Sequence, residues 1–205
     1  MPKTFSPPLL ARTEQVYPYY LKKACEVIGK YDETAHVLKL DAYNEAESLP
    51  INGGIAKNIQ LKNITLLEYN QETIDKAKAK YPELDIRQGD IRKMPFSDDA
   101  FDVILDLSTL DHIPPDEIEV AIKEYYRVMK TDGRLLLIFW ILEEEYKQEM
   151  KEWKPTNQYF FDLTQVLFIL KKYFKKIESV KIRDGGPDAE TFKVAALWQF
   201  LGEKK

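Results

Sequence analysis

The sequence predicts an α/β domain with a mostly parallel β-sheet and helices on both of its faces. Short apolar runs alternate with amphipathic helical patterns from residue 36 to about 141, and this alternation is typical of parallel strands joined by helices. The run RLLLIFWI at 134–141 is apolar on both faces, which indicates a strand covered on both sides. A length of 205 residues suits one domain with a substantial core.

An amphipathic helix is predicted at 13–31, before the alternation begins. Pro18 lies near its start, and its apolar residues recur at helical spacing. These apolar residues are Val16, Tyr20, Ala24, Val27 and Ile28. We expect Cys25, the one cysteine of the chain, to be a small buried residue of this helix.

Three strands are predicted in the first half of the chain, at 35–40, 63–69 and 84–90. The segment between the first two carries Gly53 and Gly54 and has no regular pattern. We therefore predict an irregular connection there.

Two further helices have clear end signals. The helix predicted at 70–81 has an N-cap candidate in Asn70, an acid early in its sequence and lysines late. Pro82 lies just beyond its end. The helix predicted at 114–130 has prolines and acids in its first turn. The sequence TDG then turns the chain into the strand at 134–141.

The last part of the chain contains a charged, Trp-bearing excursion at 142–158. The other predicted elements are a strand at 101–108, a helix at 163–174 and strands at 176–184 and 193–201. The loop between the last two strands is too short for a crossover helix, so we expect them to pair antiparallel at one edge of the sheet.

Composition and charge exclude several classes of protein. The net charge of −4 and pI near 5.4 give no broad attraction for nucleic acid. A single cysteine excludes an internal disulfide and a cysteine-rich zinc site, so we expect no metal. The sequence has no signal-like apolar core near its start and no run approaching the ~20 apolar residues of a membrane span. We expect a cytoplasmic protein without a membrane or nucleic-acid partner.

Glu68 ends the second predicted strand, where ligands of open parallel sheets bind. One carboxylate accepts hydrogen bonds from two adjacent ribose hydroxyls, which is why nucleotide sites carry an acid at this position. The alternative is a solvated acid that the dipole of the following helix favours. This residue alone leaves both interpretations open.

The stretch GDIRKMPFSDDAFDVILDLSTLDHI, followed by a helix and EYYRVMKTDGRLLLIF, resembles the class I S-adenosylmethionine-dependent methyltransferases, in their type 11-like small-molecule branch. The resemblance covers residues 64–141, and the tail after 157 is similar to the family's last helix and antiparallel strand pair. It implies one Rossmann-like domain with a mostly parallel seven-stranded sheet, an antiparallel C-terminal strand and helices on both faces. It also implies transfer of a methyl group from S-adenosyl-L-methionine to a small-molecule substrate, with S-adenosyl-L-homocysteine as the product.

The resemblance assigns cofactor contacts to three of the predicted strand ends. In the family, an acid meets the adenine amino group and an apolar neighbour covers the ring, positions held here by Asp90 and Ile91. Glu68 would take the ribose, with Tyr69 beside it, and Leu107 would line the methionine moiety.

Asp111 and His112 open the helix after the fourth predicted strand. Imidazole titrates near neutrality, so this pair is our candidate for the catalytic residues, with one of them as a general base. The family often carries such a pair for structural reasons. Methyl transfer from a sulfonium depends mainly on alignment and a desolvated pocket, so a dedicated base is optional.

The turn after the first predicted strand departs from the family pattern. Lys39 stands where the family has an acid, and Asp41, Tyr43 and Glu45 stand where it has glycines that let the backbone approach the cofactor. Each replacement adds a side chain to that space.

Two accounts of this turn compete. In the first, the loop is rebuilt: Asp41 or Glu45 meets the amino group of the cofactor, and Gly53 and Gly54 restore the close backbone approach. In the second, the pocket is filled and the protein is a catalytically silent binding or regulatory relative. We adopt the first, because decay of the site would not be expected to leave Glu68 and Asp90 together with the correct elements between them.

These patterns divide the single domain 1–205 into four parts. They are an N-terminal helical cap at 1–31, a cofactor-binding core at 36–141, a lid-like insertion at 142–158, and a C-terminal helix with an antiparallel strand pair at 159–205. Aromatic residues of the cap and insertion offer flat surfaces to a substrate or cofactor: Tyr17, Tyr19, Tyr146, Trp153 and Tyr159. The alternatives are that these rings pack against the helix layer and that the insertion is a dimer contact, which would make the protein a homodimer.

Overall fold

A computed structural model describes residues 9–47, 54–59, 63–142, 144, 159–184 and 195–205. These residues form a seven-stranded sheet in the order β3-β2-β1-β4-β5-β7-β6. The strands are β1 (Val37–Leu40), β2 (Ile64–Glu68), β3 (Asp85–Gln88), β4 (Phe101–Leu107), β5 (Met129–Leu142), β6 (Phe174–Asp184) and β7 (Ala195–Lys204). The helices are α1 (Leu9–Ile28), α2 (Tyr43–Glu47), α3 (Ile55–Asn58), α4 (Gln71–Lys80), the 3-10 turn η1 (Leu110–His112), α5 (Ile118–Val128) and α6 (Leu163–Tyr173).

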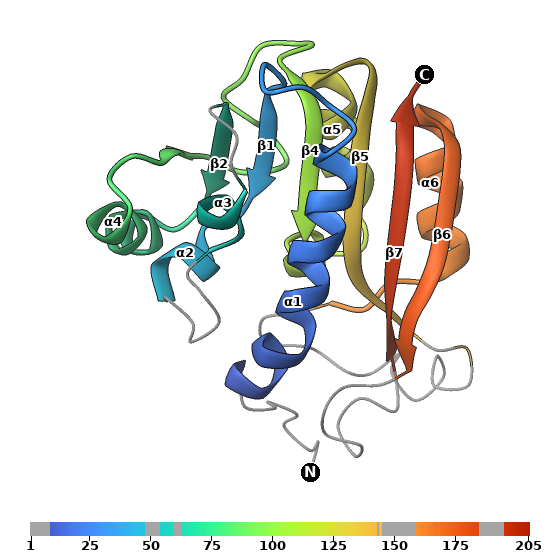
Figure 1. Ribbon diagram of the computed structural model, residues 1–205. Coiled ribbons are helices and arrows are strands. Elements are labelled where there is room, and N and C mark those ends of the chain that lie inside the picture. The colour runs from blue at the N-terminus through green and yellow to red at the C-terminus, as the bar shows by residue number, and fades with distance from the viewer. Residues whose placement is uncertain (1–8, 48–53, 60–62, 143, 145–158, 185–194) are drawn as a thin grey trace.

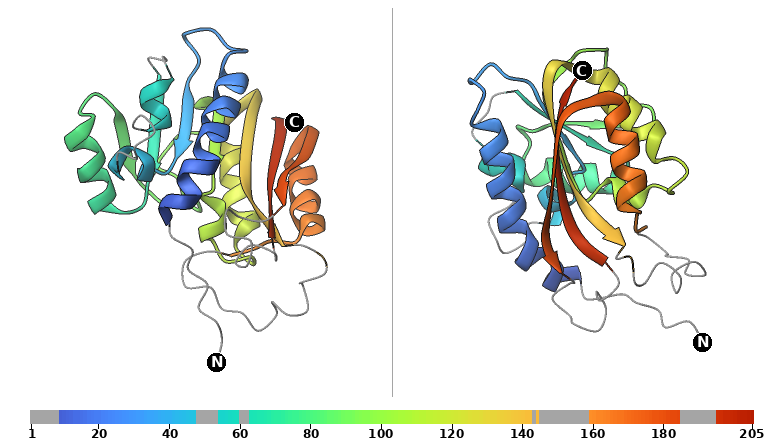
Figure 2. Two further views of the ribbon diagram at one scale, coloured as in Figure 1. Left: turned by 60° about the horizontal axis from the view of Figure 1, so that its bottom comes forward. Right: turned by 90° about the vertical axis from the view of Figure 1, so that its right-hand side faces the viewer.

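The predicted sheet is confirmed. Strands β1 to β5 pair in parallel, and β7 runs antiparallel between β5 and β6. Helices α1 and α6 lie on opposite sides of the sheet (Figure 1, Figure 2). The strand order reverses between β1 and β4, and at such a reversal an open sheet leaves a crevice for ligands.

Two apolar clusters, one on each face of the sheet, form the core. One joins side chains of the sheet to helices α1 to α4, and the other joins the sheet to α5 and α6. Strand β1 is buried along its whole length. Its alternate residues face opposite clusters, with Val37 in the first and Leu38 and Leu40 in the second. Lys39 therefore points toward the face covered by α1 to α4.

Three expectations about local structure were wrong. The connection predicted to be irregular contains the short helices α2 and α3. Strand β5 begins at Met129 rather than at 134, and the predicted turn falls inside it, with Asp132 at φ 61°. Cys25 is exposed, because it follows the buried Ala24 by one residue and a helix rotates roughly 100° per residue.

A buried carboxylate ties β4 to the turn after it and to α5. Asp106 is fully buried, and its Oδ1 accepts hydrogen bonds from the backbone N–H groups of Thr109 (2.8 Å) and Leu110 (3.3 Å). Its Oδ2 accepts from the hydroxyl of Tyr125 at 2.8 Å. Burial raises the pKa of Asp106 to about 7, although these hydrogen bonds oppose the rise. Asp106 therefore helps to position η1.

The raised pKa of Asp106 predicts a pH-dependent stability. Between pH ~4, where the carboxyl group of the unfolded chain ionises, and about 7, the folded state holds a proton that the unfolded state has lost. The contribution of Asp106 to the free energy of unfolding therefore falls as pH rises through this window. We expect Asp106→Asn to remove that component, as measured by urea unfolding from pH 4 to 8. Parallel pH profiles for the wild type and the variant would contradict the assignment.

Candidate functional site

The carboxyl ends of β1, β2, β3 and β4 meet at one edge of the sheet. The arrowheads of β1, β2 and β4 point the same way in Figure 1. Hydrogen bonds join the turns after β1 and β3 to the end of β2: Asp41 N donates to Leu67 O (2.8 Å) and Gly89 N to Glu68 O (2.9 Å). Across the point where the strand order reverses, the Thr109 hydroxyl donates to Asp41 Oδ2 at 3.2 Å. The sequence-predicted acids are thus brought to one edge.

Glu68 is held by the backbone on both sides of its strand end. Its Oε2 accepts from Ala42 N at 2.9 Å and its Oε1 from Asn70 N at 2.8 Å. Asn70 in turn caps α4, as predicted, by accepting from Glu72 N. A carboxylate has about four lone-pair positions, so both oxygens of this half-buried group retain capacity to accept from a ligand.

The turn after β3 carries Asp90 and Ile91. Both oxygens of Asp90 accept from the guanidinium of Arg92, at 2.5 to 3.1 Å, and these bonds lower the pKa of the carboxyl group. Arg92 also pairs with Glu117 at the start of α5. Ile91 is buried, whereas Tyr69, beyond β2, is 72% exposed. An incoming amino group would share Asp90 with a partly exposed arginine.

Lys39 is the unusual residue of β1, because it is a lysine only 1% exposed. Its Nζ donates to Asp41 O (2.7 Å), Asp41 Oδ1 (3.3 Å) and Glu45 Oε2 (3.1 Å). An ammonium group has three N–H donors, so all three are satisfied. Burial lowers the pKa of Lys39, but the carboxylates of Asp41 and Glu45 outweigh it and leave the pKa above its ordinary value. Lys39 is therefore charged.

Glu45 extends this network to α3. It is fully buried, and its Oε1 accepts from Ala56 N at 3.0 Å. A Cβ placed on Gly54 would lie 2.0 Å from that same oxygen. The close approach that Gly54 allows in this structure is therefore to Glu45. Gly53, the other glycine of the hypothesis, lies outside the described residues.

Asp41 takes a backbone conformation that favours glycine. Its φ is 67°, in the left-handed region where aspartate is tolerated better than most residues. Its Oδ1 accepts from Tyr43 N at 3.0 Å, and its side chain remains 20% exposed. Asp41 thus turns the chain in the position where the family has a glycine, while Lys39 fixes its carbonyl.

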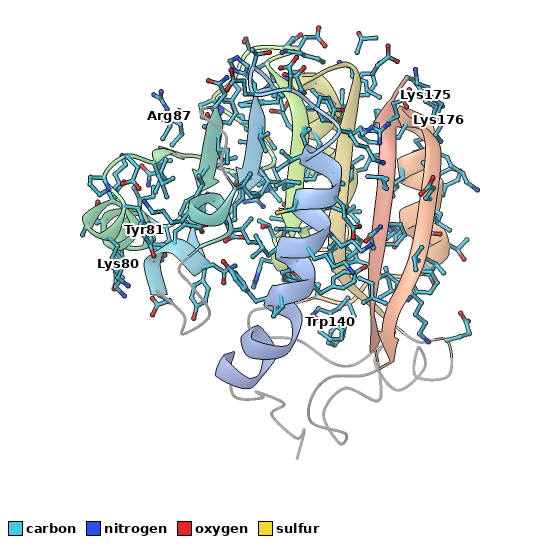
Figure 3. All side chains as sticks on the ribbon, in the orientation of Figure 1. Lys80, Tyr81, Arg87, Trp140, Lys175 and Lys176 are labelled. Atoms are coloured by element: carbon cyan, nitrogen blue, oxygen red, sulfur yellow. The ribbon has the colours of Figure 1, made fainter. Side chains whose placement is uncertain are left out.

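Helix α4 supports α2 from outside. Lys80 donates to the carbonyl oxygen of Ala46, and Figure 3 shows Lys80 beside α4. The segment after β1 is therefore anchored at Lys39, Ala56 and Lys80.

The turn after β4 brings Asp111 and His112 to the same edge as the acids. Asp111 is fully buried, and its Oδ2 accepts from the hydroxyl of Ser108 at 2.8 Å. The side chain of His112 is 57% exposed, and its Nε2 lies 3.9 Å from Asp111 Oδ1. Leu107, at the end of β4, is buried. Of the two candidates for a base, the histidine is at the surface.

The aromatic candidates have separate environments. Tyr17 lies in the apolar cluster under α1, and the hydroxyl of Tyr19 donates to Gln199 of β7 at 2.8 Å. Tyr159 is half-buried, and its backbone N–H donates to Asp111 O at 2.6 Å. Tyr146 and Trp153 lie outside the described residues.

Sequence reasoning missed the side-chain roles of Asp106 and Tyr20. Asp106 interrupts an apolar strand, a pattern that signals a buried acid in need of partners. Tyr20 was placed on the apolar face of its helix, but a tyrosine there also carries a hydroxyl to satisfy. Burial raises the pKa of that hydroxyl well above its ordinary value, and the charge of Asp111 adds to the rise.

The described residues contain neither a membrane-spanning helix nor a metal-binding cluster. None of their helices is long and apolar enough to cross a membrane. In the same residues, no group of three or more histidine, cysteine, aspartate or glutamate side chains is arranged to hold a metal ion.

The sequence matches known methyltransferases. Residues 51–137 match the family model described as a methyltransferase domain, so the match begins after the Lys39 turn. The chain is 34% identical over 96 residues to a 2-methyl-6-phytyl-1,4-hydroquinone methyltransferase of Spinacia oleracea, covering 43% of this chain and 27% of that protein. It is 34% identical over 99 residues to an uncharacterized methyltransferase of Staphylococcus carnosus, covering 48% of this chain and 46% of that protein. The chain thus spans less than half the length of these relatives.

Solved structures share the whole fold. The PH0226 protein of Pyrococcus horikoshii superposes with a TM-score of 0.68 at 20% identity, over 99% of this chain and 94% of that one. The N-methyltransferase NodS of Bradyrhizobium japonicum, solved with S-adenosyl-L-homocysteine, superposes with a TM-score of 0.66 at 12% identity, over 92% of this chain and 86% of that one. Residues 51–137 thus carry the match to a methyltransferase domain, and the sheet order and the solved structures show that the chain has the fold of these relatives.

Proposed function

We propose that the chain transfers a methyl group from S-adenosyl-L-methionine to a small-molecule acceptor and releases S-adenosyl-L-homocysteine. The observation that carries this proposal is Glu68. Its carboxylate stands at the end of β2, is fixed by two backbone N–H groups, and keeps lone pairs for a pair of ribose hydroxyls. Its position one strand from the reversal of strand order is where nucleotide-binding sheets place such an acid.

The residues at this edge fit an adenosine. Asp90 and Ile91 would hold the adenine through a carboxylate and an apolar surface, with Tyr69 beside the ribose. The methionine end would extend toward Asp41 and Leu107, while Tyr17 supports α1 from the core. Glu45 and Gly54 would act indirectly, because the contacts of Glu45 are to Lys39 and Ala56. The bound cofactor supplies the methyl group on a sulfonium, which is an excellent leaving group.

The protein's part in the reaction is mainly to align the acceptor and exclude water. For a hydroxyl-bearing acceptor, Asp111 or His112 would take the proton. The spinach relative is named for a hydroquinone, and an acceptor of that hydroxyl-bearing kind suits this pair. The cap at 1–31 and the insertion at 142–158 would shape the acceptor's side, with nucleic acid and membrane absent from its partners and the cytoplasm as its location.

A catalytically silent relative is the alternative, and the charged turn after β1 is the feature that raises it. Lys39, Asp41 and Glu45 put three charged side chains where the family has an acid and glycines. Their mutual hydrogen bonds draw Lys39 and Glu45 away from the surface, to 1% and 0% exposure. This arrangement favours a rebuilt turn rather than a filled pocket.

Glu68→Gln tests the proposal. We expect S-adenosyl-L-homocysteine to bind the wild type with micromolar affinity in calorimetric titration. The variant keeps the size of the side chain but loses a charge-assisted hydrogen bond, which is worth about 1.5–3 kcal/mol or roughly 10- to 100-fold in affinity. Glu72→Gln, on the exposed first turn of α4, is the matched control and should bind like the wild type. A wild type that gives no binding heat would refute the proposal.

Variants of Lys39 and Glu45 test the rebuilt turn. Lys39→Met leaves Glu45 buried without its counter-charge, which we expect to cost about 3–5 kcal/mol of stability. Adding Glu45→Gln to Lys39→Met should recover part of that loss, because no buried charge then remains of the pair. Urea unfolding of both single variants and the double variant measures the coupling. Additive losses would mean that the two side chains do not interact in the folded protein.

A further inference from the structure

Arg92 occupies both oxygens of the Asp90 carboxylate. Its backbone N–H donates to Asp90 Oδ1 at 2.8 Å and its Nε to the same oxygen at 2.9 Å. Its Nη2 donates to Asp90 Oδ2 at 2.5 Å, and Nε also lies 3.1 Å from that oxygen. A carboxylate has about four lone-pair positions, so these contacts use the acceptor capacity of Asp90. The two acids of the site therefore differ, because Glu68 retains lone pairs for a ligand and Asp90 does not.

The same guanidinium is bonded to a second acid. Arg92 Nη1 donates to the carboxylate of Glu117, the residue before α5. The side chains of Asp90, Arg92 and Glu117 are all half-buried, so none of them is sealed from an incoming group. Two acids thus share one cation, and Glu117 is placed to keep that cation when Asp90 accepts from another donor.

The turn after β3 is held to α5 without the side chain of Arg92. The backbone N–H of Met94 donates to Glu124 Oε2 of α5 at 2.8 Å. From the same helix, Arg127 donates to Met94 O at 3.1 Å and to Phe96 O at 2.8 Å. A change of partner by the Arg92 guanidinium therefore does not release the turn.

We propose that Arg92 is a specificity-determining residue of the site: it competes with the nucleobase for Asp90, and Glu117 retains it when a base with an amino group binds. This rests on the proposed function, in which Asp90 is the adenine contact. An amino group reaches an oxygen of Asp90 only by displacing a guanidinium N–H.

A base with a carbonyl oxygen at the same position meets a different surface. A guanidinium has five N–H groups, and the bonds of Arg92 to Asp90 and Glu117 use three of them. The remaining N–H groups can donate to a carbonyl oxygen while Arg92 stays paired with Asp90. Arg92 therefore reduces the preference of the site for an amino group over a carbonyl group.

Calorimetric titration of the full chain with two ligands tests this proposal. They are S-adenosyl-L-homocysteine and S-inosyl-L-homocysteine, which has a carbonyl oxygen in place of the amino group. Arg92→Gln removes the competitor, so it should bind the adenosyl ligand about 2- to 5-fold more tightly than the wild type, the range of an exposed ion pair. It should bind the inosyl ligand no more tightly. Arg87→Gln, which breaks the exposed pair of Arg87 with Asp85 on β3, is the matched control and should bind both ligands like the wild type.

Glu117→Gln should have the opposite effect. It removes the acid that retains the displaced guanidinium, so the adenosyl ligand should bind about 2- to 5-fold more weakly. Glu119→Gln, an equally exposed acid in the first turn of α5 that pairs with Lys172, is its control and should bind like the wild type. General loosening of the turn would weaken binding in both Arg92→Gln and Glu117→Gln, whereas exchange of partners moves them in opposite directions.

Three outcomes would overturn the proposal while the proposed function stands. The first is unchanged or weaker binding of S-adenosyl-L-homocysteine by Arg92→Gln, and the second is wild-type affinity in Glu117→Gln. The third is equal tightening of both ligands by Arg92→Gln, since the effect would then not pass through the amino group of the base. If neither the wild type nor Arg92→Gln binds the adenosyl ligand, the proposed function fails and the proposal falls with it.

Discussion

A buried ammonium group sets the path of the chain after the central strand. Lys39 points into the core from β1, and its three N–H donors must be met because a buried unpaired charge is costly. Asp41 meets two of them, one through its carbonyl and one through its carboxylate, and Glu45 meets the third. Satisfying one lysine therefore fixes the left-handed turn at Asp41 and the placement of α2. It also explains Gly54, since a side chain there would collide with Glu45.

This arrangement does with side chains what a glycine-rich turn does with bare backbone. A glycine turn keeps space at the end of β1 by omitting side chains. Here the side chains are present but hydrogen bond to one another, and the backbone N–H of Ala56 holds Glu45 against α3. Lys39 is paired with Glu45 and with one oxygen of Asp41, and Asp41 and Glu68 remain partly exposed beside the reversal of strand order. Two acids so placed suit a ligand that brings an ammonium group and ribose hydroxyls to this edge of the sheet.

The sequence predicts the sheet, but not the contacts that shape the site. Strands and the Asn70 cap follow from local signals, namely apolar period and capping chemistry within a few residues, and Glu68 follows from its place at a strand end. The pairing of Lys39 with Glu45 depends on the short helix α2, which contains Glu45. Local pattern does not predict this helix, because its sequence YNEAE has no apolar period of its own. Exposure of Cys25 depends on the rotation of α1, which tertiary packing sets. The hydrogen bond of Thr109 to Asp41 joins residues far apart in the chain, so no local signal encodes it.

A crystal structure of the protein with bound S-adenosyl-L-homocysteine is the most direct test of whether a turn held by Lys39 leaves room for a nucleoside. The account predicts both ribose hydroxyl oxygens within hydrogen-bond distance of the Glu68 carboxylate, with Lys39 and Glu45 still paired beneath them. A structure at saturating ligand in which Asp41 or Glu45 fills that edge and no nucleoside lies beside Glu68 would contradict it.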